Sequence, residues 1–522
     1  MYHINFNNPI HVHFIGIGGI SMSGLAHILR DKNFTVSGSD AAESALTKEL
    51  TAAGCHIVYS QTADNITSDI DLVVYTAAIR DTNPELSAAR AAGIPTITRA
   101  ELLGQIMTNY KTAVNIAGTH GKTTTTSMLT EILMAGNCDP TISVGGILDS
   151  IGGNIRVGQS GIFVTEACEY TNSFLSFHPT MNIILNVKED HLDFFKDIDD
   201  IRHSFKLFTE KLPADGTLII NTDIDNYEYF YQDTSCEVIT VGSDPAKSMY
   251  SAADIAFDEM GCCTYTLLIE GTPSGQIHLS VPGVHNVYNS LAAIAAAKKL
   301  GLSLEVIATG LSGFHGTERR FEKKGEFNGV TVIDDYAHHP DEIKATLASA
   351  AHYPHKTVWC VFQPHTYSRT KILLTEFAEA LSHADKVVLA DIYAARETDT
   401  KDVSCMTIVS SGDNHTLEQI EKQLNKKLDI IKVKTFDEPA SISRELMLVK
   451  VKYNRNNRRD IMEICNILKA QIVDMSKYQM MIQICDVPDR VQLFLKMLNS
   501  ISIVEVARTG TVALQKCHDQ EN

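Results

Sequence analysis

The chain has 522 residues, of which 44% are hydrophobic and 21% are charged. A single hydrophobic core does not organise so long a chain, so the sequence predicts three or four folded domains. The formal net charge of −18 argues against nonspecific binding to nucleic acid. No apolar run approaches the length of a membrane span, and the first residues lack the basic and apolar regions of a signal peptide. We therefore expect a cytoplasmic protein that binds neither nucleic acid nor membrane, with reduced thiols among its 11 cysteines.

The charge is unevenly distributed along the chain. From Asp402 onward there are 17 basic and 16 acidic residues, whereas the first 401 residues carry a net charge of −19. The same tail holds only two of the 31 glycines. A change of this kind marks a boundary between two sequences of different character near residue 401.

Three runs of alternating apolar strands and helical stretches precede this boundary. The first covers residues 11–100, the second begins at 112 and continues through an alanine-rich stretch that ends near 300, and the third begins near Arg319. Such alternation predicts parallel sheets with helices on both faces. The third run is expected to contain VTVIDDYA, KTVWCVFQ and DKVVLADIY as successive strands.

The pattern changes after Asp391. Residues 443–517 are predicted to form strand, helix, strand, strand, helix and strand, which is the split β-α-β arrangement of ferredoxin-like domains. The segment CMTIVSSGDNHTLEQIEKQL parallels MMIQICDVPDRVQLFLKML further along, as internal repeats do. The first copy lacks its opening strand and helix, so residues 402–440 are predicted to be half of a domain.

A glycine-rich loop closes the first strand and opens the first helix. It contains Gly16, Gly18, Gly19 and Ser21, and Asp40 ends the next strand. Glycines at this place let the backbone approach a phosphate group at a helix N-terminus, where free N–H groups and the helix dipole favour an anion. Ser21 replaces the third glycine of the dinucleotide fingerprint, so NAD is not the best interpretation. A nucleotide ligand and a tight structural turn both remain open.

A second glycine-rich loop, GTHGKTT, follows the strand at 112–117 and precedes a helix. Its backbone N–H groups can hold phosphates, the Lys122 ammonium offsets their charge, and the Thr123 hydroxyl can bind Mg²⁺. The loop is two residues shorter than the general P-loop pattern. A glycine turn with a solvated lysine is the alternative, but the strand–loop–helix context favours a phosphate site.

Acidic side chains and a histidine follow two further strands of the second run. Glu166 and Glu169 lie in TEACEY, and His191 lies in NVKEDHLD. Mg²⁺ requires oxygen ligands, and nucleotide-dependent enzymes supply few of them. A histidine after a strand is more often a hydrogen-bonded loop residue than a metal ligand, so the role of His191 remains open at this point.

Polar side chains also gather after two strands of the third run. The motif DDYAHHP at 334–340 follows one strand, and QPH at 363–365 with Arg369 follows the next. Because ligands of open parallel sheets bind beyond the carboxyl ends of the strands, these residues are expected to converge on one crevice. Capping of a helix by the paired histidines is the alternative.

Eight motifs in order, at consistent spacings, resemble those of the Mur ligase family. They are GIGGISMSG, GTHGKTTTT, TEACEY, NVKEDHLD, PGVHNVYN, GTERRFE, DDYAHHPDE and QPHTYSRT. The resemblance covers about residues 11–400 and is closest to the members that attach L-alanine to UDP-N-acetylmuramate. It implies three domains of an α/β protein: a Rossmann-like UDP-sugar-binding domain at 1–108, a central P-loop ATPase-type domain at 109–315 and a truncated Rossmann-like domain at 316–401.

The resemblance also implies roles for individual residues. The residues that would bind the UDP-sugar are Gly16, Gly18, Gly19, Ser21 and Asp40. The residues that would bind ATP are Gly118, Thr119, His120, Gly121, Lys122, Thr123, Thr124, His285, Asn286, Asn289, Arg320 and Tyr336. Mg²⁺ would be held by Thr123, Glu166 and His191. The catalytic candidates are Lys122, His191, His338 and Arg369, with His365 also facing the phosphates and the incoming alanine.

The implied reaction forms an amide in peptidoglycan precursor synthesis. ATP would convert the lactyl carboxylate of UDP-N-acetylmuramate into an acyl phosphate, which the amine of L-alanine then attacks. His191 and His338 are both candidates for the base that deprotonates the amine. Many family members have an arginine where this chain has Thr366, which leaves Arg369 as the cation near the substrate carboxylate. A related ligase that recycles whole muropeptides is the neighbouring alternative.

From about residue 403 the chain resembles the small regulatory subunit of acetolactate synthase. The matching segments are SCMTIVSSGDNHTLEQIEKQLNKKLDIIKV and RELMLVKVK. The resemblance implies a partial amino-acid-binding ACT domain at 402–440, a complete ferredoxin-like domain at 441–522, and the acetolactate synthase catalytic chain as a partner. A half-domain buries too little surface to offset its ordering entropy. We therefore expect a compromised third ligase domain with impaired activity, and an acetolactate synthase-binding module as the alternative function.

Overall fold

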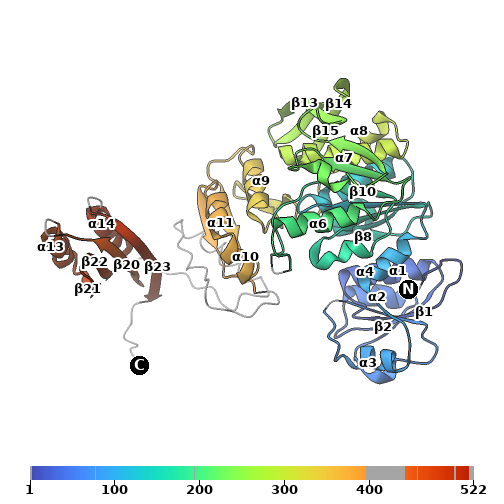
Figure 1. Cartoon of the computed structure of the whole chain (residues 1–522), viewed down its shortest axis with the longest axis horizontal. Coiled ribbons are helices and arrows are strands. Elements are labelled where there is room, and N and C mark those ends of the chain that lie inside the picture. The colour runs from blue at the N-terminus through green and yellow to red at the C-terminus, as the bar shows by residue number, and fades with distance from the viewer. Residues whose placement is uncertain are drawn as a thin grey trace. The chain divides into compact units, whose positions relative to one another are not determined.

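The computed structural model describes residues 3–394 apart from 77 and 193, residues 441–498 apart from 455 and 456, and residues 501–515. It divides into two compact units, Met1–Lys356 with Thr375–His383, and Thr357–Leu374 with Ala384–Asn522. The two units are described separately below, and Figure 1 gives the element labels. The partial ACT domain expected at 402–440 lies outside the described residues.

The first domain is an open sheet of five parallel strands in the order β3-β2-β1-β4-β5. The strands are β1 (His11–Ile15), β2 (Thr35–Ser39), β3 (His56–Val58), β4 (Leu72–Tyr75) and β5 (Thr96–Thr98). The helices are α1 (Ile20–Asp31), α2 (Ala45–Ala52), α3 (Pro84–Ala91) and α4 (Arg99–Met107). The strand order reverses beside β1, so the glycine-rich loop after β1 opens at the switch point where such sheets bind ligands. The predicted Rossmann-like arrangement is confirmed.

The central domain is built on one ten-stranded sheet, in the order β15-β14-β13-β12-β11-β10-β6-β9-β7-β8. Its strands are β6 (Thr112–Ala117), β7 (Thr141–Leu148), β8 (Gly153–Arg156), β9 (Ile162–Ala167), β10 (Met181–Ile184), β11 (Thr217–Asn221), β12 (Glu237–Val241), β13 (Tyr250–Phe257), β14 (Cys262–Ile269) and β15 (Thr272–Pro282). Its helices are α5 (Lys122–Ala135), α6 (Ile198–Thr209), α7 (Val284–Lys299) and α8 (Leu304–Gly313).

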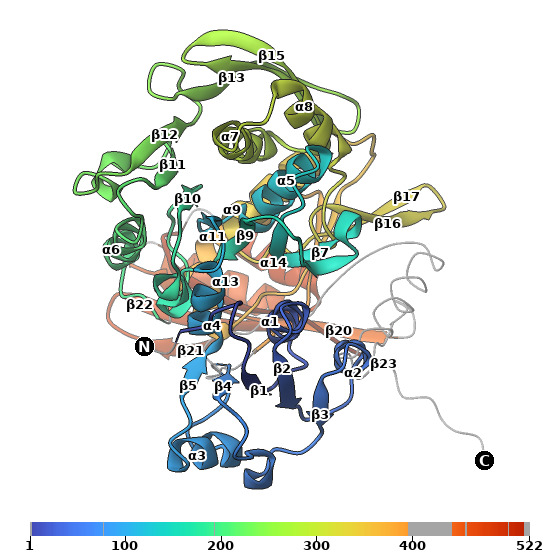
Figure 2. The same ribbon diagram turned by 90° about the vertical axis from the view of Figure 1, so that its right-hand side faces the viewer.

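Helices cover both faces of the central sheet, because its middle strands are apolar on both sides. Ile183 of β10 packs into the cluster formed with α5 and α7, whereas Ile184 packs into the cluster formed with α6. Figure 2 shows α6 on one side of the sheet and α5 and α7 on the other. The strands β6, β9, β10 and β11 are parallel, so their carboxyl ends meet at one edge. That edge carries the second glycine-rich loop.

The strand pairing after Arg319 differs from the single parallel sheet that the sequence predicts. The hairpin of β16 (Glu322–Phe327) and β17 (Val330–Asp334) is antiparallel, and α9 (Pro340–Ala350) and α11 (Leu374–Leu381) follow it. Asn328 and Gly329 join the two strands with φ angles of 49° and 78°. Both residues of a type I′ turn need positive φ, and Asn-Gly supplies them at low cost. β17 therefore pairs with β16, its neighbour in the sequence, in an antiparallel hairpin.

The second unit contains a small parallel pair and a complete α+β domain. The pair is β18 (Trp359–Phe362) with β19 (Lys386–Leu389), with α10 (Tyr367–Ile372) between them. The α+β domain consists of β20 (Ser441–Lys452), α13 (Arg458–Leu468), β21 (Gln471–Met475), β22 (Gln479–Asp486), α14 (Pro488–Met497) and β23 (Ile503–Gln515). Its sheet order is β21-β22-β20-β23, and it has its own buried core. The predicted ferredoxin-like tail is confirmed.

Two predictions from composition concern the whole chain. Among the described residues, no helix combines the length and the apolar character that crossing a membrane requires. The nine cysteines that the structure describes are all free thiols. Cys262 and its neighbour Cys263 lie on opposite faces of β14, one partly exposed and one buried.

Candidate functional site

The second glycine-rich loop turns from β6 into α5 through two residues with positive φ. Gly118 has φ of 146° and Gly121 has φ of 84°. A Cβ atom added at Gly121 would lie 2.5 Å from Oδ1 of Asn289. Glycine is therefore required at 121 both by the backbone conformation and by the close approach of α7. The result is a tight strand–loop–helix turn that leads directly into α5.

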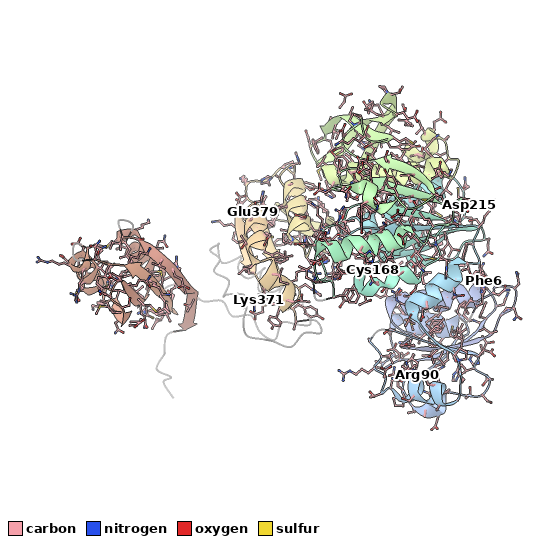
Figure 3. The ribbon with its side chains drawn as sticks, in the orientation of Figure 1. Phe6, Arg90, Cys168, Asp215, Lys371 and Glu379 are labelled. Atoms are coloured by element: carbon pink, nitrogen blue, oxygen red, sulfur yellow. The ribbon has the colours of Figure 1, made fainter. Side chains whose placement is uncertain are left out.

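Lys122, the first residue of α5, folds back over this loop. Its Nζ donates hydrogen bonds to the carbonyl oxygens of Gly118 at 2.5 Å and Thr119 at 3.1 Å. It also lies 3.1 Å from Oε2 of Glu169, a side chain that is 2% exposed. Cys168, labelled in Figure 3, directly precedes Glu169 after β9. Burial alone would lower the pKa of Lys122, but the charge of Glu169 raises that pKa above its usual value.

Asn186 holds the loop from the neighbouring strand end, and the sequence analysis did not identify it. Its Oδ1 accepts from the N–H of His120 at 2.8 Å, and its Nδ2 donates to the carbonyl of His120 at 3.0 Å. The Thr119 hydroxyl accepts from the N–H of Lys188 at 2.9 Å. These bonds fix the loop to the segment after β10. The asparagine at the start of NVKEDHLD was the only sequence signal for this contact.

The loop opens on a cavity of about 310 Å³ within the first unit. Seven of the residues expected to bind ATP line it, namely His120, Gly121, Thr124, His285, Asn286, Asn289 and Arg320. Further lining comes from Leu185, Val241, Val281 and Phe314, which are apolar, and from Asp335 and Glu342, which are acidic. Loop residues, side-chain amides and apolar side chains around one cavity suit a nucleotide, with phosphates at the loop and a base among the apolar side chains.

The start of α7 forms one wall of this cavity. Asn286 donates from Nδ2 to the carbonyl of Pro282 at 2.8 Å, and Asn289 donates from Nδ2 to Oδ1 of Asn286 at 3.0 Å. Both asparagines are 7% exposed. The adjacent Gly283 has φ of 98°, which turns the chain from β15 into the helix. The two amides are therefore held in fixed orientations at the cavity wall.

Each of the three residues expected to bind Mg²⁺ has a defined neighbour. Gly145 and Gly146 of β7 lie between Thr123 and Glu166: the Glu166 carboxylate accepts from the N–H of Gly145 at 2.5 Å, and a Cβ atom at Gly146 would lie 3.2 Å from Cγ2 of Thr123. Their hydroxyl and carboxylate oxygens are the donors that Mg²⁺ prefers. His191 instead has its ring 4.6 Å from the ring of Tyr170.

Several residues around the β16–β17 hairpin gather at Tyr336, which does not itself line the cavity. The guanidinium carbon of Arg319 lies 4.8 Å from the centre of its ring and that of Arg320 lies 5.5 Å away. The His338 ring lies 5.2 Å from the Tyr336 ring. Asp335 accepts hydrogen bonds from the N–H groups of Phe321 and Ala337, yet burial raises the pKa of its carboxyl group. Arg320 and His338 therefore both lie against the Tyr336 ring, and the roles expected of the three residues stay predictions.

A second set of donor atoms lies at the same edge of the cavity. Among the described residues, His120, His339 and Asp341 form the one group of histidine, cysteine and acidic side chains whose ligand atoms lie within 4.8 Å of one another. The rings of His120 and His339 are 4.7 Å apart. Nitrogen donors suit transition metals rather than Mg²⁺. This group is distinct in chemistry from the oxygen pair of Thr123 and Glu166.

The first glycine-rich loop is held by Asp40. The N–H of Gly18 donates to Oδ2 of Asp40 at 2.7 Å, and a Cβ atom at Gly18 would lie 2.9 Å from that oxygen. Gly16 has φ of 84°, and Gly19 caps α1. The Ser21 hydroxyl accepts from Nη1 of Arg99 at 2.9 Å. Arg99, at the start of α4, therefore brings a positive charge to this loop, which the sequence analysis did not identify.

Arg369 and His365 belong to the second compact unit. Nη1 of Arg369 lies 3.4 Å from Nδ1 of His365, and the His365 ring lies 5.5 Å from the ring of Tyr393. Thr366 between them has φ of 68°. Their convergence with His338 on one crevice stays a prediction.

Three family models match the chain in succession. The Mur ligase family catalytic domain matches residues 11–111, the Mur ligase middle domain matches 116–297, and the Mur ligase glutamate ligase domain matches 319–450. A protein of Lachnospira eligens named UDP-N-acetylmuramate–L-alanine ligase is 74% identical over 434 residues, covering 82% of this chain and 95% of that protein. The chain belongs to the Mur ligase family. The recognition made from its motifs is confirmed.

Other relatives agree with this Mur ligase assignment. A UDP-N-acetylmuramate–L-alanine ligase of Agathobacter rectalis is 57% identical, covering 82% of this chain and 94% of that protein. The crystal structure of a UDP-N-acetylmuramate-alanine ligase from Thermotoga maritima matches with a TM-score of 0.62 and 32% identity, covering 74% of this chain and 86% of that one. A murein peptide ligase from Psychrobacter arcticus matches with a TM-score of 0.60 and 27% identity, covering 73% and 84%.

The tail of this Mur ligase matches a second family. The model for the small subunit of acetolactate synthase covers residues 444–517, which include most of β20 and every element from α13 to β23. The third Mur ligase model runs to 450, past the expected end of the resemblance near Thr400, and the two matches overlap at 444–450. The domain boundaries at 401 and 440 stay predictions.

Proposed function

We propose that this chain is an ATP-dependent ligase that joins L-alanine to the lactyl carboxylate of UDP-N-acetylmuramate, a step of peptidoglycan precursor synthesis. The observation that carries the proposal is the phosphate loop around Lys122, which opens on a cavity lined by Asn286, Asn289 and Arg320. The relatives that bear this name align with nearly their whole length. The murein peptide ligase structure has a lower identity and TM-score than the Thermotoga maritima UDP-N-acetylmuramate-alanine ligase, which favours alanine over a peptide as the amine substrate.

The reaction proceeds by two transfers. A carboxylate oxygen of the sugar substrate attacks the γ-phosphorus of ATP, the bond to ADP breaks, and an acyl phosphate forms. The alanine amine then attacks the acyl carbon, phosphate leaves with the electron pair of the C–O bond, and the amine loses a proton. Both steps concentrate negative charge on oxygen atoms that fixed cations stabilise. Lys122 supplies such a cation at the loop, because its pKa keeps it protonated.

Mg²⁺ is the divalent ion that fits Thr123 and Glu166. When bound, it would offset negative charge on the phosphates. Thr123 and Glu166 approach the same glycine pair of β7, and their donor atoms are both oxygen. His191, whose ring lies 4.6 Å from the ring of Tyr170, is the third ligand that we assign to this ion.

The UDP-sugar is assigned to the first domain. Its diphosphate would meet the N–H groups of the loop at Gly16–Gly19, at the switch point of the sheet. Arg99 adds a cation beside Ser21. Asp40 holds the loop closed through Gly18, so we assign it to loop geometry as well as to the ligand.

The base that accepts the amine proton is assigned to His338 rather than His191. The His338 ring lies 5.2 Å from the Tyr336 ring, which also lies 5.5 Å from the guanidinium carbon of Arg320, a residue that lines the cavity. Arg369 would pair with the carboxylate of alanine.

The decisive assay measures ADP release by the full chain. We expect release only when ATP, Mg²⁺, UDP-N-acetylmuramate and L-alanine are all present, with L-alanine preferred to a tripeptide acceptor. Hydrolysis of ATP that is indifferent to the sugar nucleotide would refute the ligase assignment. Preference for the tripeptide would instead assign the chain to muropeptide recycling.

A second function is proposed for the tail, on the observation that β20–β23 form a complete domain with its own core. This domain would bind the catalytic chain of acetolactate synthase. A pull-down of that catalytic chain with the full-length protein tests the assignment, and Glu376→Gln, an exposed site on α11, serves as a control variant. Failure to retain the catalytic chain would remove this function without affecting the first.

A further inference from the structure

Glu342 occupies a central place in the site, and neither the sequence motifs nor the proposed reaction assigns it a role. It lies in the first turn of α9, lines the nucleotide cavity, and its side chain is only 14% exposed. Its Oε2 accepts hydrogen bonds from the backbone N–H groups of His338 at 3.0 Å and His339 at 3.3 Å. Together with the His339 side chain, these bonds form a capping box at the start of α9. One carboxylate oxygen, Oε2, therefore caps the N-terminus of α9.

The other carboxylate oxygen, Oε1, contacts residues outside α9. Oε1 of Glu342 lies 3.2 Å from Nδ1 of His120 and 3.9 Å from Nη1 of Arg320. His338 also faces the carboxylate, with its Nδ1 3.6 Å from Oε2. His120 belongs to the phosphate loop, Arg320 precedes β16 and His338 follows β17. A single buried carboxylate thus connects three segments that are far apart in the sequence.

The charge of Glu342 is stabilised by these neighbours. Burial alone would raise the pKa of Glu342, but the hydrogen bond to His120 holds that pKa well below its usual range. The side chain is therefore a carboxylate at neutral pH, with both oxygens engaged by donors. A neutral glutamine could keep the helix cap but would have only one acceptor oxygen.

The contact also fixes the orientation of the His120 ring. With Nδ1 turned toward Glu342, the Nε2 atom of His120 is buried and has no hydrogen-bond partner among the described residues. Buried polar atoms are normally paired, and an unpaired one at a site calls for a ligand. His120 lines the cavity beside Gly121 and Thr124, where the phosphates of a nucleotide would lie.

We propose that Glu342 is a positioning residue of the ligase, which fastens the phosphate loop of the central domain to α9 and sets His120, Arg320 and His338 around the nucleotide. The inference rests on the proposed function. Glu342 acts through these side chains and not by contact with the substrate, because its own oxygens are occupied. The carboxylate consequently couples nucleotide binding to the placement of the third-domain residues.

Glu342→Gln separates this role from helix capping, because glutamine also satisfies a capping box. The matched control is Glu305→Gln, the same exchange at an exposed position in the first turn of α8. Calorimetric titration of the full chain with ATP, without sugar or alanine, gives the dissociation constant, and thermal unfolding reports structure. We expect Glu342→Gln to weaken ATP binding about 10-fold, as the loss of a charge-assisted hydrogen bond implies. Glu305→Gln should leave the affinity unchanged.

A double-mutant cycle with His120→Gln tests whether Glu342 acts through that ring. In the His120→Gln background, the effect of Glu342→Gln should shrink to below about 3-fold, because coupled residues are not additive. An equal effect in both backgrounds, or an ATP affinity of Glu342→Gln within about twofold of wild type, would overturn the inference. A wild-type chain that binds no ATP would instead overturn the proposed function, so the two failures are distinguishable.

Discussion

Replacing Lys122 by methionine tests whether its ion pair with Glu169 supports the phosphate loop. Nζ lies 3.1 Å from the Glu169 carboxylate, which is 2% exposed. At an effective dielectric constant of about 20, unit charges at this separation attract by about 5 kcal/mol, and desolvation offsets part of that. Removal of one partner from a buried pair costs about 3–5 kcal/mol, because the other charge is left uncompensated. We expect the variant to lower the free energy of unfolding by about 3 kcal/mol.

The pH dependence of this difference has a defined sign. The pKa of Lys122 is raised above its usual value of 10.5 in the folded protein. A group whose folded pKa is raised contributes its full stability below the unfolded pKa and loses it as the pH rises through the folded pKa. The difference between wild type and Lys122→Met should therefore be constant from about pH 6 to 9 and decrease above about pH 10.5.

The double variant Lys122→Met with Glu169→Gln separates stability from activity. Because it removes both charges at similar volume, it should recover stability to within about 1 kcal/mol of wild type. Its ligase activity should stay at least about 100-fold reduced, since the cation at the phosphates is gone. Urea unfolding followed by circular dichroism is the assay, because the single tryptophan, Trp359, lies in β18 of the other unit. A double variant no more stable than Lys122→Met would refute the reasoning.

Three further changes test other parts of the site and the tail. Gly121→Ala should weaken ATP binding about 10-fold or more in a calorimetric titration, because it combines positive-φ strain of about 1–2 kcal/mol with a clash against α7. The control for strain alone is Gly271→Ala, because Gly271 has a similar φ and no neighbour within 4 Å. Asn186→Ala removes both bonds to the loop and should lower the thermal midpoint by about 3–6 °C while raising KM for ATP; an unchanged KM would contradict the clamp. Arg508→Ala removes the guanidinium group that lies 2.6 Å from the Glu445 carboxylate, and Glu445 is only 3% exposed. This variant should destabilise the tail domain by about 3 kcal/mol in a denaturant titration and leave ligase activity unchanged.

The two glycine-rich loops show how far local sequence signals reach. Both loops follow an apolar strand and precede a helix, and the structure places His120 and Gly121 of the second loop at the cavity and the loop at 16–19 at the switch point of the first sheet. The ferredoxin-like tail was equally readable, because its strand and helix periods are set by residues that are neighbours in the chain. The hairpin at Asn328-Gly329 carried a strong local signal too. The sequence analysis predicted a parallel sheet there, and this prediction was wrong for β17, which pairs with β16 in an antiparallel hairpin.

The sequence by itself determined the order of the elements, the phosphate loop and the family, because each depends on residues close together in the chain. Only the tertiary structure decided which side chains hold that loop in place. His120 meets Asn186 across 66 positions and Glu342 across 222. Contacts of this kind arise from the packing of separate strands and helices. The sequence around an asparagine or a glutamate does not indicate whether the side chain makes such a contact. The physical roles of Asn186, Glu342 and Arg99 therefore came from distance and burial.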